Sequence, residues 1–153
     1  MSIEIEKKFI VEHIPFPLDN FKNVKITQGY IAVEEGYAEV RIRYIEDRYV
    51  LTVKSDRSNF RFEEECILDA SHGVKLLHFC KNRIVKKIRY YIPYNNIQIE
   101  LDIFKGKLEG LVIAEVEFKC FDDIKNFVTP SWFGLDVTDD KRYKNKNLAI
   151  YGL

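Results

Sequence analysis

Ionised side chains in this sequence recur in pairs of one sign, two positions apart, within runs of apolar and β-branched residues. The basic positions are Lys8, Arg41, Arg43, Lys54, Lys87 and Arg89, with Arg61 and Arg83 as outlying members. The acidic positions are Glu4, Glu6, Glu63, Glu65, Glu100, Asp102, Glu115 and Glu117. Guanidinium and ammonium groups from several strands suit a ligand with many anionic oxygens, such as a chain of phosphates. Carboxylates without histidine or cysteine beside them suit a hard cation such as Mg²⁺ or Mn²⁺.

The balance of the two sets indicates that both ligands act together. The acids slightly outnumber the bases, so a bound polyphosphate alone would leave the set strongly negative. A divalent metal on the carboxylates restores the balance and bridges to phosphate oxygens. Any single pair could instead be a structural ion pair, but enclosed ions are costly unless well compensated, so the whole set is a poor stability device. The sequence therefore predicts metal dependence.

Strands must position these pairs, because the polar and apolar residues alternate with a period of two. We expect strands near residues 2–11, 27–34, 37–45, 48–54, 60–68, 83–92, 97–104 and 111–119. Short turn-like connections between several of them favour antiparallel neighbours. We expect helices around 17–21, from a cap at Asp69 to about Lys81, at 121–128 and at 145–151.

Two architectures satisfy this alternation. An open antiparallel sheet could pack its apolar face on the helices and leave its charged face in solvent. Alternatively, the sheet could curl into a barrel whose charged face lines an aqueous tunnel. Like charges one pleat apart repel each other unless a ligand of opposite sign lies between them, which favours the tunnel. We therefore expect an α+β fold: an eight-stranded antiparallel β-barrel with a charged interior and helices packed on the outside.

Composition restricts the class of protein. With 153 residues, 46% hydrophobic and 31% charged, the chain has the size and make-up of a single globular domain spanning 1–153. The formal net charge of zero argues against nucleic-acid or membrane-surface partners. Three distant cysteines without metal-ligand spacing are typical of reduced thiols. We see no signal peptide or stretch long enough to span a membrane, and expect a cytoplasmic location.

The ordered motifs resemble those of the CYTH superfamily, the triphosphate tunnel metalloenzymes. The hallmark Glu-x-Glu-x-Lys is present as Glu4, Glu6 and Lys8. The further matches, in order, are Gln28-Gly29-Tyr30, Arg41-x-Arg43, Thr52-x-Lys54, Arg61-x-Glu63-x-Glu65, Lys87-x-Arg89-Tyr90, Glu100-x-Asp102, Leu108-x-Gly110-Leu111, Glu115-x-Glu117, and the C-terminal segments 136–138 and 142–149. The resemblance implies an eight-stranded tunnel that binds a triphosphate together with a divalent metal, Mg²⁺ or Mn²⁺.

The resemblance also implies roles for single residues. The residues expected to bind the triphosphate are Lys8, Arg41, Arg43, Lys54, Lys87, Arg89 and Arg61. The expected metal ligands are Glu4, Glu6, Glu115 and Glu117, with Glu63, Glu65, Glu100 and Asp102 completing the shell or positioning the attacking water. The residues expected to be catalytic are Glu4, Glu6, Lys8 and Lys87, with a water held by a glutamate or a lysine as the nucleophile.

In its short length the chain resembles the small bacterial members of the superfamily, several of which prefer inorganic tripolyphosphate. We expect hydrolysis of tripolyphosphate, or a related triphosphate, to diphosphate and phosphate. Alternatives are a class IV adenylate cyclase and a thiamine triphosphatase, for which Trp132 would be the aromatic platform. More distant alternatives are a non-catalytic module that binds polyphosphate or nucleotides and a structural sheet protein. The expected partner is a small-molecule triphosphate, without nucleic acid or membrane, and assembly as a homodimer is left open.

Overall fold

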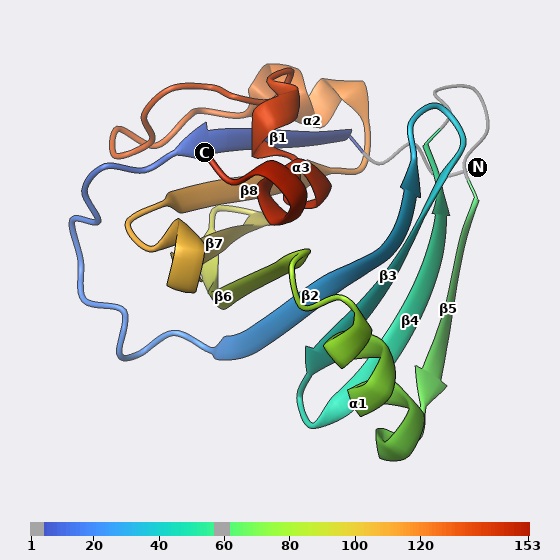
Figure 1. The fold of residues 1–153 in the computed structure, drawn as a ribbon. Helices are drawn as coiled ribbons and strands as arrows, with labels where there is room; N and C mark the ends of the chain where they lie inside the picture. Colours follow the sequence, from blue (N-terminus) through green and yellow to red (C-terminus); the bar gives the residue numbers. More distant parts are fainter. Residues whose placement is uncertain (1–4, 57–61) are drawn as a thin grey trace. The chain divides into compact units, whose positions relative to one another are not determined.

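A computed structural model describes residues 5–56 and 62–153 of the chain (Figure 1). The strands are β1 (Ile5–Ile10), β2 (Asn23–Glu34), β3 (Ala38–Ile45), β4 (Arg48–Ser55), β5 (Glu63–Leu68), β6 (Ile84–Tyr94), β7 (Ile97–Lys105) and β8 (Val112–Phe118). The α-helices of this part are α1 (Ala70–Phe79), α2 (Phe121–Asn126) and α3 (Asn145–Tyr151), and two 3₁₀ turns are η1 (Gly106–Leu108) and η2 (Lys141–Tyr143). All eight predicted strands are confirmed, and so are the helices predicted after Asp69, at 121–128 and at 145–151.

Hydrogen bonds join the strands in the order β1-β8-β7-β6-β2-β3-β4-β5. The pairs β1–β8, β7–β8, β2–β3, β3–β4 and β4–β5 are antiparallel, as the short connections predict. Over the described residues the order is open, with β1 at one end and β5 at the other, so hydrogen bonds there do not close it into a barrel. The chain forms two compact units, Met1–Val24 with Ile88–Tyr143 and Lys25–Lys87 with Lys144–Leu153, and each is described in turn.

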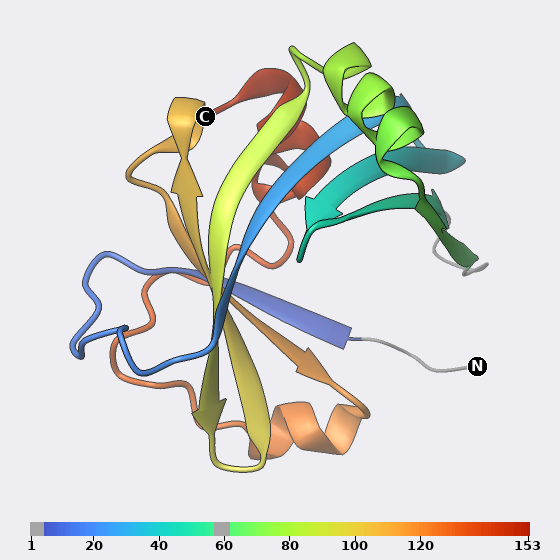
Figure 2. The same cartoon turned by 90° about the horizontal axis from the view of Figure 1, so that it is seen from below.

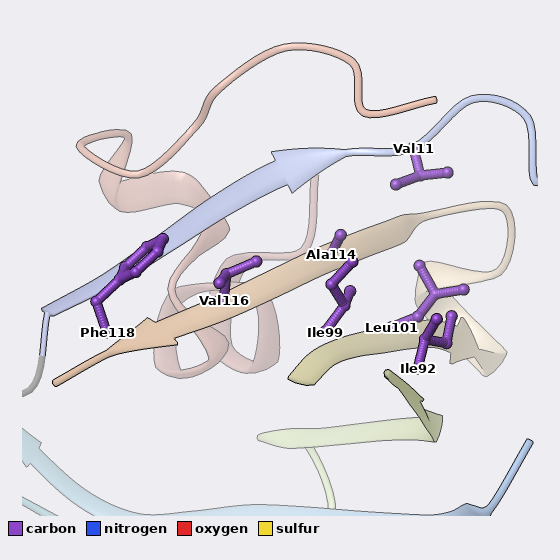
Figure 3. Packing of buried hydrophobic residues seen from close by; sticks show 7 residues of the cluster. All are labelled: Val11, Ile92, Ile99, Leu101, Ala114, Val116 and Phe118. Atoms are coloured by element: carbon purple, nitrogen blue, oxygen red, sulfur yellow. The ribbon is translucent and has the colours of Figure 1, made fainter. Parts of the chain in front are cut away.

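The first unit is built on one apolar sheet face. Its buried cluster consists of Val11, Ile92, Ile99, Leu101, Ala114, Val116 and Phe118, where Val11 directly follows β1 and the others lie on β6, β7 and β8 (Figure 3). The helix α2 follows β8 and lies beside the β6–β7 hairpin (Figure 2). Aromatic rings extend this core: Trp132 meets Phe16 and Phe133 edge-on, with centroids 5.3 and 4.6 Å away. This apolar packing leaves the opposite face of the same strands to polar residues.

A segment after α2 covers the second edge of β1. Gly134 N–H donates to Ile10 O at 2.7 Å, and Ile10 N–H donates to Leu135 O at 2.9 Å. Val137 N–H donates to Lys8 O at 2.8 Å, and Lys8 N–H donates to the Thr138 hydroxyl at 3.1 Å. Glycine is required at 134 because a Cβ there would lie 2.7 Å from the Ile10 carbonyl oxygen. Both edges of β1 are therefore occupied around Lys8.

The second unit packs α1 against β3 and β4 (Figure 1). The predicted cap is confirmed, since the Asp69 carboxylate accepts the N–H of His72 at 3.1 Å. Gly73 lets the helix approach the sheet, because a Cβ at this position would lie 2.1 Å from Cγ of Tyr49. With α1 on this face, the charged residues of β3 and β4 occupy the other face.

The prediction of a helix around 17–21 is wrong. This stretch is a single turn in which Phe21 N–H donates to Leu18 O at 3.0 Å. Strand β2 begins at Asn23, four residues earlier than predicted, which leaves too little chain for a helix. Phe16 and Phe21 instead pack edge to face, with centroids 5.7 Å apart. No described helix combines the length and the apolar character needed to cross a bilayer.

Candidate functional site

The strand register of the first unit places charged residues in rows on one face. Lys8 of β1 lies opposite Glu115 of β8, which lies opposite Glu100 of β7, and Glu6 lies opposite Glu117. Directly paired residues of antiparallel strands project to the same side of a sheet, so these side chains share a face. The alternation read from the sequence is confirmed in these strands.

Lys8 lies among carboxylates. Its ammonium group is 3.2 Å from Glu115 and 3.4 Å from Glu6, and its side chain is only 9% exposed. Burial lowers the pKa of Lys8, but the charges and hydrogen bonds of Glu115 and Glu6 outweigh it and raise the pKa above its ordinary value. Lys8 is therefore a firmly charged group that joins β1 to β8.

Arg89 is the centre of the same face. Its Nε and Nη2 donate to the two carboxylate oxygens of Asp102, each at 2.7 Å, in a bidentate pair. Nη2 also donates to Glu115 at 3.0 Å, and Nη1 contacts Glu100. Burial lowers the pKa of Arg89, but the hydrogen bonds and charge of Asp102 and the charges of Glu115 and Glu100 raise it above its ordinary value. We call Glu6, Glu100, Asp102, Glu115, Glu117, Lys8 and Arg89 the acidic cluster.

The donors of the acidic cluster fit a hard divalent cation. They are all carboxylate oxygens, the ligands that Mg²⁺ and Mn²⁺ prefer, and the carboxylates outnumber the two cations. Within residues 5–56 and 62–153, no three acidic, histidine or cysteine side chains converge as a metal site. Lys8 and Arg89 hold several of the carboxylates. A metal would therefore have to compete with these two cations for oxygens.

The second unit also carries a charged face, on which cations lie opposite or beside Glu39, Glu63 and Glu65. In its register Arg41 lies opposite Thr52, Thr52 opposite Glu65, and Lys54 opposite Glu63. We call Arg41, Arg43, Lys54, Lys87 and Lys146 the basic cluster. Two of its ion contacts are long: Arg41 is 3.8 Å from Glu63, and Lys54 is 3.7 Å from Glu63. Among residues 5–56 and 62–153, Arg41 Nε is a buried donor without a hydrogen-bond partner, which suits an anionic ligand.

Arg43 is oriented by a buried polar relay. Its Nε donates to the Gln28 side-chain oxygen at 2.9 Å, and the Gln28 amide donates to the Tyr30 hydroxyl at 2.6 Å. Gln28 and Tyr30 are both buried. Burial, with the nearby charge of Glu39, raises the pKa of Tyr30 above its ordinary value. The motif Gln28-Gly29-Tyr30 was noted in the sequence without a role, and the structure shows that it supports Arg43.

Helix α3 supplies two further polar residues. Lys87, which is buried, donates to the side-chain oxygen of Asn145 at 3.4 Å. Lys146 is 2.8 Å from Asp56 and 3.8 Å from Glu39. Sequence reasoning placed Asn145 and Lys146 in a motif but assigned them no role. Only the pairing of α3 with distant strands reveals their contacts.

The predicted site residues that the structure describes belong to these two clusters, except Glu63 and Glu65, which lie on the adjacent strand β5. The structure brings together Glu6, Lys8, Arg89, Glu100, Asp102 and Glu115 in the first unit and Arg41, Lys54 and Glu63 in the second. Glu65 accepts a hydrogen bond from Thr52 at 3.1 Å. The predicted residues Glu4 and Arg61 lie outside the described part of the chain.

Residues 2–145 match the family model of the CYTH domain. The chain belongs to the CYTH domain family. An inorganic triphosphatase from Nitrosomonas europaea is 39% identical over 148 residues, covering 96% of this chain and 97% of that protein. An inorganic triphosphatase from Acetivibrio thermocellus is 37% identical over 151 residues, covering 97% of this chain and 94% of that protein. The crystal structure of an inorganic triphosphatase matches with a TM-score of 0.78 at 37% identity, covering 98% of this chain and 96% of that chain.

Membership of the CYTH domain family confirms the resemblance seen in the ordered motifs. It also confirms the predicted fold class, eight antiparallel strands accompanied by helices, since the match to a solved CYTH-like relative extends over nearly the whole chain. The charged motif residues that the structure describes lie in β1 and β3–β8. The described charged motif residues of these strands therefore have defined cross-strand partners, whereas the motif segments at 108–111, 136–138 and 142–149 lie outside the strands.

Proposed function

We propose that this CYTH-domain protein is a metal-dependent inorganic triphosphatase, which hydrolyses tripolyphosphate to diphosphate and phosphate. The observation that carries the proposal is the sorting of charge into an acidic cluster and a basic cluster, each on one face of its strands. The two relatives at 39% and 37% identity are both named inorganic triphosphatase, which supports the same substrate here. A net charge of zero supports a small substrate over a nucleic acid.

In this proposal the basic cluster binds the phosphate oxygens. Arg41 is the best suited of its members, because its buried Nε has no acceptor in the described part of the chain and its contacts to Glu39 and Glu63 are 3.9 and 3.8 Å long. Phosphate oxygens would provide shorter, charge-assisted hydrogen bonds. Arg43, Lys54 and Lys87 would bind further oxygens, as the motifs imply.

The acidic cluster would hold Mg²⁺ or Mn²⁺. We assign Glu6, Glu100, Glu115 and Glu117 as its described ligands, together with Glu4 from the motif, while Glu63 and Glu65 stay proposed for the outer shell. When bound, the metal would polarise a phosphoryl oxygen and offset negative charge. Lys8, at 3.2 Å from Glu115, would contribute positive charge at the same place.

Lys87 and the glutamates of the hallmark motif are proposed to act on the attacking water. A buried lysine held at its ammonium by Asn145 has few alternative conformations, which suits a group that must orient a nucleophile. Glu6, Lys8 and Lys87 are the described members of the proposed catalytic set, and Glu4 is its fourth member.

The alternatives have less support. For a thiamine triphosphatase, Trp132 would have to offer a free ring face, yet it is half-buried between Phe16 and Phe133. A class IV adenylate cyclase would need a pocket for a base, and the relatives that cover nearly the whole chain are named for inorganic triphosphate. A non-catalytic binding module would bind tripolyphosphate without releasing phosphate.

A phosphate-release panel tests the proposal. We expect release from tripolyphosphate with Mg²⁺ or Mn²⁺, much less from thiamine triphosphate and ATP, and none after chelation of the metal. Glu6→Gln keeps the shape of the side chain and removes its charge, so it should abolish most of the activity. Formation of cyclic AMP from ATP, or tight binding of tripolyphosphate without turnover, would overturn the proposal.

A further inference from the structure

We propose that Asp102 is a positioning residue that acts through Arg89 and is not a ligand of the metal. This assignment rests on the proposed function, since it concerns how the acidic cluster receives its metal. It divides the five carboxylates of the cluster into four that are offered to the metal and one that orders them.

The first argument is the strand register. Glu100 belongs to a charged row, opposite Glu115, which is itself opposite Lys8. Asp102, two residues further along β7, belongs to an apolar row, because it lies opposite Ile113 and Ile113 lies opposite Ile10. Asp102 and Ile113 are both fully buried. Asp102 therefore lies at the closed, apolar end of the face.

The second argument is the occupancy of the Asp102 carboxylate. Both oxygens accept hydrogen bonds from Arg89 at 2.7 Å, the geometry of a strong bidentate pair. A divalent ion bound to the same oxygens would lie close to the guanidinium charge and be repelled by it. Mg²⁺ also keeps several of its waters, for which an apolar, fully buried position offers no room.

The third argument is what Arg89 does with its other donors. With Nε and Nη2 fixed on Asp102, the planar guanidinium directs Nη2 to Glu115 and Nη1 to Glu100. These two glutamates lie opposite each other in the charged row, Glu100 on β7 and Glu115 on β8. Asp102 thus fixes Arg89, and Arg89 fixes two of the proposed metal ligands.

Titration calorimetry with Mn²⁺, without substrate, tests the assignment on four full-length proteins: the wild type, Asp102→Asn, Arg89→Met and the double variant. If Asp102 acts only through Arg89, adding Asp102→Asn to Arg89→Met should change the Mn²⁺ affinity by no more than about twofold. If Asp102 is a ligand, the double variant should bind Mn²⁺ about tenfold or more weakly than Arg89→Met, and the assignment is overturned. Glu115→Gln is the matched control, expected to weaken binding in both backgrounds.

A second cycle, thermal unfolding without metal, keeps the assignment separate from the proposed function. Asp102→Asn should lower the melting temperature of the wild type clearly and that of Arg89→Met little or not at all. Equal shifts in the two backgrounds would overturn the coupling of Asp102 to Arg89. A wild type that neither binds Mn²⁺ nor releases phosphate would overturn the proposed function, while this cycle would still decide the coupling. Arg89→Lys replaces Arg89→Met if the latter does not fold.

Discussion

Arg89 of the acidic cluster and the pair Arg41 and Lys54 of the basic cluster differ in how tightly they contact carboxylates. In the acidic cluster, Arg89 makes hydrogen bonds of 2.7 and 3.0 Å to Asp102 and Glu115. In the basic cluster, Arg41 and Lys54 lie 3.8 and 3.7 Å from Glu63, and the buried Nε of Arg41 has no hydrogen-bond partner among the described residues. Close pairing orders groups before a ligand arrives, whereas loose pairing leaves cations free to bind one. This difference supports the proposal that the acidic cluster binds a metal and that the basic cluster binds phosphate oxygens.

Neutralising the acidic cluster should have the largest effect. Glu115→Gln removes a carboxylate that contacts both Lys8 and Arg89. We expect kcat for tripolyphosphate to fall by about 100-fold or more and the Mn²⁺ concentration needed for activity to rise. Steady-state phosphate release over a range of Mn²⁺ concentrations measures both quantities. Glu109→Gln, an exposed position of the same unit, should leave them unchanged.

Removing a cation from the basic cluster should weaken the binding of substrate. Arg41→Met keeps the length of the side chain and removes its donors, so we expect KM for tripolyphosphate to rise by about 10- to 100-fold. The Mn²⁺ requirement should change much less, in contrast to Glu115→Gln. Arg48→Met, whose guanidinium is 55% exposed and 3.1 Å from Glu46, is the control. Equal effects of Arg41→Met and Arg48→Met would contradict the division of roles.

The anchoring of α3 predicts a smaller, pH-dependent change in stability. Lys146→Met leaves Asp56 and Glu39 without this cation, and we expect the free energy of unfolding to fall by about 1–3 kcal/mol. Burial raises the pKa of Asp56, but the hydrogen bonds of Lys146 and Gly36 and the charge of Lys146 lower it below its ordinary value. The stability that the Asp56–Lys146 pair contributes is therefore present at pH values above the ordinary aspartate pKa. It is lost as the pH falls through the lowered pKa of Asp56.

Urea unfolding at neutral and at acidic pH measures this effect. The loss caused by Lys146→Met should shrink on acidification, because protonated Asp56 no longer pairs with lysine. Lys75→Met, on the exposed side of α1, should cost little at either pH. A loss that is the same at both pH values would refute the role of the Asp56–Lys146 pair.

The smallest expected effect concerns the backbone of β1. Thr138→Val removes the hydroxyl that accepts the Lys8 N–H at 3.1 Å, which should destabilise the fold by about 1 kcal/mol and slightly lower kcat. Thr138→Ser keeps the hydroxyl and should retain most of the stability and most of kcat. Thermal unfolding and phosphate release compare the two variants directly. Identical behaviour of the valine and serine variants would show that the hydroxyl is not the cause.

Strand positions and their faces could be predicted from the sequence because they depend on local alternation. Lys8, Glu100 and Glu115 were assigned to one face, and the register confirms it. The turn at 17–21 was mistaken for a helix because the early start of β2 is set by sheet pairing and not by local propensity. Contacts between individual side chains could not be predicted for the same reason.

Properties that depend on partners distant in the sequence could not be predicted. The sequence offers Asp102 and Glu100 as equivalent carboxylates on one strand. Their difference arises from the partners across β8, Ile113 and Glu115, which only the register identifies. The contact of Lys146 with Asp56 spans most of the chain and has no local signature.

The segment from Gly134 to Thr138 has a consequence for the behaviour of the protein in concentrated solution. An uncovered outer strand offers a ladder of unsatisfied amides on which a foreign polypeptide can grow, the usual starting point of fibril formation. Here Lys8 and Ile10 of β1 already satisfy their amides with this segment. By pairing with β1, the segment from Gly134 to Thr138 therefore disfavours the addition of a second chain to the strand that carries Lys8.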